Sequence, residues 1–134
     1  MSLSCGILTL GCKVNQYESR AMAELLAAQD VAIRPFEDVC DMYLIHSCTV
    51  TAESDRKVRQ MTRRAIRRNP NAVIAVCGCA VQKDPQAIAQ IPGVSIVCGN
   101  RRKTELVSEA LNQLHNGRPE SPLILCGGLE ELPL

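Results

Sequence analysis

The strongest constraint on the fold of this chain is a regular alternation of short apolar runs with longer amphipathic segments. The apolar runs have the length and composition of buried strands, and the segments between them have the 3.6-residue periodicity of helices. The predicted strands cover residues 5–10, 31–34, 42–47, 72–77, 94–98 and 123–126. The predicted helices cover about residues 15–29, 51–69, 85–91 and 101–116.

Strands that alternate with helices predict βαβ units and a mostly parallel sheet covered on both faces. The composition agrees, because aromatic residues make up only 2% of the chain and Val, Ile, Leu and Ala must build the core. We therefore expect an α/β fold, a three-layer Rossmann/flavodoxin-like domain with about five to six strands. It should occupy residues 1–126, with 127–134 as the start of a linker. No apolar run approaches the roughly 18 residues of a membrane span.

Eight cysteines are the main anomaly of the composition. The first residues lack the basic region of a secretory signal, so we expect a cytoplasmic protein. In that reducing compartment cysteines favour metal binding or catalysis over disulfides. Apolar neighbours indicate that four of the eight are small buried side chains, namely Cys5, Cys40, Cys98 and Cys126.

Cys12, Cys48 and Cys79 each lie just beyond a predicted strand and before a helix. Asn15 is expected to cap the first of these helices. The carboxyl ends of parallel strands meet at one edge of the sheet, which is where such folds bind ligands. Nearby helix N-termini lower thiol pKa values. Three converging thiolates suit an iron–sulfur cluster or zinc.

Other interpretations of this edge stay open. A structural zinc site would use Cys77 as a fourth ligand, although Cys77 is more simply the last inward-facing residue of its strand. A metal-free binding module would leave all the cysteines incidental. His46 is interpreted as a polar strand-end residue, the alternative being a contact that supports the cysteine site. The chain has neither a G-x-G-x-x-G nor a P-loop motif, so nothing supports a phosphate-binding site.

The segment 56–68 carries seven basic residues and no acidic residue. The remainder of the chain carries eight basic and fourteen acidic side chains. A concentrated basic helix face can attract the phosphates of RNA. The alternative is an ordinary solvated face, with Val58, Met61 and Ala65 turned toward the core.

Three segments carry a family resemblance: TLGCKVNQYE at 9–18, SCTVT at 47–51 and VCGCAVQ at 76–82. They resemble the N-terminal domain of the radical-SAM methylthiotransferases, over about residues 4–115. The branch most similar modifies threonylcarbamoyl-adenosine in tRNA by adding a methylthio group to C2. The resemblance implies that Cys12, Cys48 and Cys79 bind a [4Fe-4S] cluster with one open iron. That iron is thought to hold the sulfur for insertion.

The chain departs from the family pattern in four respects. His46-Ser47 stands where Asn-Thr is common, and Cys77 stands where Thr or a small residue is common. There is no C-x-x-x-C-x-x-C run, so we expect this chain to lack the core that binds S-adenosylmethionine and a second [4Fe-4S] cluster. We expect it to lack the family's C-terminal RNA-binding domain too. The resemblance implies tRNA and a sulfur donor as partners, with tRNA contacted mainly through the absent domains. The isolated fragment should be inactive.

Overall fold

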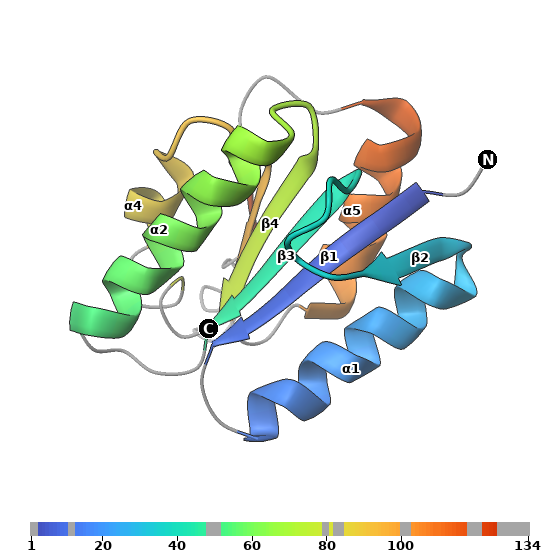
Figure 1. The fold of residues 1–134 in the computed structure, drawn as a ribbon, viewed down its shortest axis with the longest axis horizontal. Coiled ribbons are helices and arrows are strands. Elements are labelled where there is room, and N and C mark those ends of the chain that lie inside the picture. Colours follow the sequence, from blue (N-terminus) through green and yellow to red (C-terminus); the bar gives the residue numbers. More distant parts are fainter. Residues whose placement is uncertain are drawn as a thin grey trace, which may run out of the picture.

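A computed structural model describes residues 3–10, 13–47, 52–78, 81, 85–99, 103–117 and 122–125 (Figure 1). A single sheet runs through the described structure, with helices on both of its faces. In chain order the elements are β1 (Leu3–Leu10), α1 (Lys13–Ala28), β2 (Val31–Arg34), β3 (Met42–Ser47), α2 (Ala52–Arg68), β4 (Val73–Gly78), α4 (Pro85–Ala89), β5 (Ile96–Cys98), α5 (Lys103–Asn116) and β6 (Leu123–Leu125).

The sheet has six strands in the order β2-β1-β3-β4-β5-β6, and every neighbouring pair is parallel. This confirms the predicted α/β, Rossmann/flavodoxin-like class. None of the described helices is long and apolar enough to span a bilayer. The start of the first helix was predicted wrongly. It begins at Lys13, so Asn15 lies within its first turn and not at the position before the helix. A capping preference contributes only about 1 kcal/mol, too little to dictate where a packed helix begins.

The sheet separates two hydrophobic cores. On one face α2 and α4 contribute Val58, Ala65 and Ile88 to the core. On the other face α1 and α5 pack together, and Leu26 and Leu106 are fully buried there. Figure 1 shows these two helix pairs on opposite sides of the strands. The central strands β3 and β4 are buried along their whole length, as expected for a parallel sheet covered on both faces.

Candidate functional site

The carboxyl ends of β1, β3 and β4 meet at one edge of the sheet. Leu10 is the register partner of Ser47, and Ser47 is the register partner of Gly78. Neighbouring strands lie about 4.8 Å apart, so these three strand ends fall within roughly 10 Å. We call this rim, defined by Leu10, Ser47 and Gly78, the strand-end edge.

The chain reverses direction across the sheet between β1 and β3. From β1 the chain passes through α1 to β2 on one side, and from β3 it passes through α2 to β4 on the other. The helices that follow β1 and β3 thus cover opposite faces of the sheet, a divergence that Figure 1 shows. In doubly wound sheets a divergence of this kind creates the crevice in which ligands bind.

Gly78 lets β3 and β4 end close together. Its φ of +111° lies in the left-handed region that side chains disfavour. A Cβ atom at this position would clash with the backbone carbonyl of Ser47 and lie 2.9 Å from the Ser47 nitrogen. Ser47 also donates a hydrogen bond from Oγ to the carbonyl oxygen of Cys77, at 3.4 Å. The absence of a side chain at residue 78 is therefore a steric requirement of this edge.

A buried chain of polar contacts ties β1, α1 and β3 together just below the strand-end edge. Thr9 donates from Oγ1 to Ser19 Oγ at 2.7 Å, and Ser19 Oγ lies 2.8 Å from His46 Nδ1. Because the Thr9 proton goes to Ser19, the Ser19 hydroxyl is free to donate to His46 Nδ1. His46 is thus a fully buried residue that holds α1 against the sheet. The sequence analysis missed Ser19, whose role depends on the pairing of β1 with β3.

Cys77 and Cys98 lie in the same row of the sheet as Thr9 and His46. His46 is the register partner of both Thr9 and Cys77, and Cys77 is the register partner of Cys98. Both thiols are fully buried in the core beneath α1 and α5. Cys98 donates from Sγ to the Gly99 carbonyl at 3.3 Å. The interpretation of both cysteines as buried core residues is confirmed.

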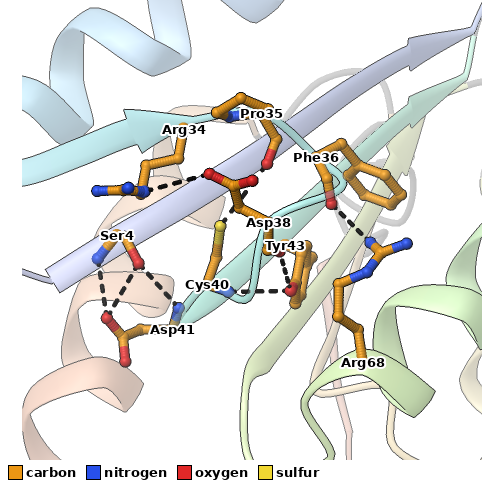
Figure 2. Close-up of polar contacts among 9 residues, drawn as sticks. All are labelled: Ser4, Arg34, Pro35, Phe36, Asp38, Cys40, Asp41, Tyr43 and Arg68. Atoms are coloured by element: carbon orange, nitrogen blue, oxygen red, sulfur yellow. Dashed lines mark hydrogen bonds and ion pairs between the residues drawn. The ribbon is translucent and has the colours of Figure 1, made fainter.

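The opposite rim of the sheet holds Cys5 and Cys40, which are also buried. Figure 2 shows Cys40 in a polar network, where its backbone nitrogen donates to Tyr43 Oη at 2.9 Å. The Tyr43 hydroxyl in turn donates to the Asp38 carbonyl at 2.6 Å. Burial raises the pKa of both thiols. The burial of these two side chains confirms the prediction that Cys5 and Cys40 are small buried residues.

The three predicted ligands, Cys12, Cys48 and Cys79, lie outside the described residues, as does Cys126. Residue 12 directly precedes α1, residue 48 directly follows β3, and residue 79 directly follows β4. Within the described part of the chain, no cluster of three or more His, Cys, Asp or Glu side chains is arranged to hold a metal ion. The described residues thus form the strand ends next to which the three predicted ligands occur in the sequence.

The strand order and the divergence between β1 and β3 define the chain as a doubly wound α/β domain. A family model described as uncharacterized protein family UPF0004 matches residues 4–99. The chain therefore belongs to this family. Together with the relatives that follow, this match confirms the resemblance to the N-terminal domain of the methylthiotransferases.

Two similar relatives are named threonylcarbamoyladenosine tRNA methylthiotransferase MtaB. The one from Bacillus subtilis is 48% identical over 99 residues, which cover 74% of this chain and 22% of that protein. The one from Aquifex aeolicus is 39% identical over 99 residues, which cover 74% of this chain and 24% of that protein. A ribosomal protein uS12 methylthiotransferase RimO from Roseiflexus castenholzii is 27% identical over 129 residues, which cover 96% of this chain and 27% of that protein. The chain spans about a quarter of the length of these relatives.

Proposed function

We propose that this chain is the iron–sulfur domain of a cytoplasmic tRNA methylthiotransferase. The full enzyme would add a methylthio group to threonylcarbamoyl-adenosine in tRNA, as the names of the relatives from B. subtilis and A. aeolicus suggest, and the family resemblance implies C2 as the position. The domain would occupy residues 1–126, and 127–134 would lead toward a radical-SAM core. Sulfur would come from a separate donor.

The observation that carries this proposal is the register of the three strand ends. Cys48 and Cys79 are each one residue beyond Ser47 and Gly78, and Cys12 is two residues beyond Leu10. Consecutive Cα atoms are about 3.8 Å apart, so the backbone of each cysteine stays within about 8 Å of its strand end. Covalent connectivity and register together support convergence of the three thiols at the strand-end edge.

The proposed ligands of a [4Fe-4S] cluster are Cys12, Cys48 and Cys79. Thiolates are the usual ligands of such clusters, and three of them leave one iron without a protein ligand. When bound, the cluster would supply a coordination position for sulfur. The chain would contribute the rest: Gly78 allows close approach of two strands, and the Thr9–Ser19–His46 contacts hold α1 beside the edge.

The burial of Cys77 argues against the zinc alternative. Cys77 is fully buried beneath α1 and α5, in the row before the strand-end edge, and pairs in register with Cys98. A thiol packed in this core would have to leave it to complete a tetrahedral zinc site. The burial of Cys77 therefore supports three thiol ligands over four.

Iron and acid-labile sulfide content after anaerobic reconstitution tests the proposal. Wild type should bind about four irons per chain. Ser in place of Cys12, Cys48 or Cys79 should abolish stable binding, whereas Cys98→Ser should retain it. No iron in wild type, or equal loss in Cys98→Ser, would contradict the proposed ligand set. One tightly held zinc that is lost in Cys77→Ser would favour the structural zinc site instead.

A further inference from the structure

Helix α2 presents a basic face to solvent. Its inner side packs on the sheet through Val58 and Ala65, which are fully buried, and Thr62 donates from Oγ1 to the Val58 carbonyl at 2.7 Å. Five cations of the helix are exposed: Arg56, Lys57, Arg63, Arg64 and Arg67. At 3.6 residues per turn, these five lie within an arc of about 120° opposite the buried side. We call this set of five the α2 basic face.

The charges of the α2 basic face are not neutralised within the described structure. The ion pair found there joins Arg34 to Asp38, at 3.5 Å, and does not involve α2. Arg68 differs from the five. It donates from Nη1 to the Phe36 carbonyl at 2.6 Å and lies over the rings of Phe36 and Tyr43 (Figure 2). Arg68 therefore stabilises the fold, and within the predicted basic segment 56–68 the five exposed cations are the ones available to contact RNA.

The α2 basic face begins close to the strand-end edge. Four residues separate the end of β3 from Ala52, the first residue of α2, and Figure 1 shows this end of the helix on the side where the strand arrows terminate. Arg56 lies about 6 Å along the helix axis from Ala52, and Arg67 lies about 16 Å further. A strand bound along the helix would thus extend toward the proposed cluster site.

The chemistry of the face favours RNA over other anionic partners. Four of the five cations are arginines, whose planar guanidinium groups bind phosphate oxygens through two hydrogen bonds. The large apolar side chains that are exposed in the described structure are Leu25, Ile33 and Val39, and none belongs to α2. A membrane-binding helix would carry such residues beside its cations.

We propose that the α2 basic face is an RNA-docking surface that guides the substrate strand toward the strand-end edge. This inference rests on the proposed function, since the strand that would dock is part of the tRNA that the proposed enzyme modifies. Docking along α2 would neutralise up to five phosphates. Such contacts make affinity fall with salt, by a factor that depends on the number of phosphates neutralised.

The test compares two double variants of the full chain in binding fluorescently labelled, unmodified tRNA. Arg63→Gln with Arg67→Gln removes two cations from the α2 basic face, and Arg20→Gln with Arg34→Gln removes two exposed cations elsewhere. The first variant should lower the slope of log affinity against log salt by about 1.4–1.8. Between about 50 and 200 mM salt, wild type should therefore lose roughly tenfold more affinity than this variant. The second variant should behave like wild type.

If the two double variants lowered the slope of log affinity against log salt by the same amount, the docking surface would be overturned. Displacement of tRNA by polyglutamate as effectively as by unlabelled tRNA would also overturn it, because it would indicate an acidic protein partner. Iron content measured on the same samples separates this inference from the proposed function. Normal iron with unchanged tRNA binding in the α2 variant would refute only the docking surface, whereas absence of iron from wild type would refute the cluster.

Discussion

Replacing Gly78 with Ala should destabilise the fold more than the same change at Gly117. Both glycines have a positive φ, +111° and +95°. An alanine in that region costs about 1–3 kcal/mol. At Gly117 a Cβ atom would meet nothing within 4 Å, whereas at Gly78 it would clash with the Ser47 carbonyl. Overpacking of that kind adds about 1–3 kcal/mol. We expect the free energy of unfolding to fall by about 2–6 kcal/mol in Gly78→Ala and by about 1–3 kcal/mol in Gly117→Ala.

Urea unfolding followed by circular dichroism measures this difference, with Gly117→Ala as the matched control for backbone strain. The reconstituted iron content of both variants adds a functional reading. Because the clash would separate the ends of β3 and β4, Gly78→Ala should also bind less iron, while Gly117→Ala should bind as much as wild type. Equal destabilisation of the two variants would refute the steric argument for Gly78.

Two further predictions concern the opposite rim. Tyr43→Phe removes the acceptor of the Cys40 backbone N–H and the donor to the Asp38 carbonyl. The free energy of unfolding in urea should therefore fall by about 1–3 kcal/mol. The iron content should not change. A loss under about 0.5 kcal/mol would argue against these bonds. Burial raises the pKa of Cys5, so the folded chain keeps this proton after the unfolded chain loses it near pH 8.5. The contribution of Cys5 to stability is complete below that pH. Above that pH it should fall by up to about 1.4 kcal/mol per pH unit. Cys5→Ala should remove this decrease from the pH dependence of unfolding.

Most of the fold could be predicted from the sequence because burial leaves a direct pattern in a parallel sheet. The strands β3 and β4 are buried on both faces and appear in the sequence as continuous apolar runs. Their ends were predicted to within one residue, and those ends fix where Cys48 and Cys79 occur relative to the edge. The same apolar context correctly identified Cys77 and Cys98 as core residues.

The sequence could not reveal contacts that depend on strand order. Ser19 on α1 meets His46 only because α1 packs over the face on which Thr9 and His46 are register partners. Likewise, Arg68 appears in the sequence as one more cation of a basic helix. Its engagement with the Phe36 carbonyl, 32 residues away, requires the tertiary packing of α2 against the loop after β2.

The length and position of the strands also bear on edge-to-edge pairing between copies of the chain. The outermost strand β2 has four residues, and it leaves few backbone groups open to pairing with another copy. The ion pair of Arg34 with Asp38 adds charge at the β2 margin. The strands β3 and β4, which are buried along their whole length, are each enclosed by a neighbour on both sides. Aggregation should therefore require opening of the sheet, and we expect native molecules to resist it.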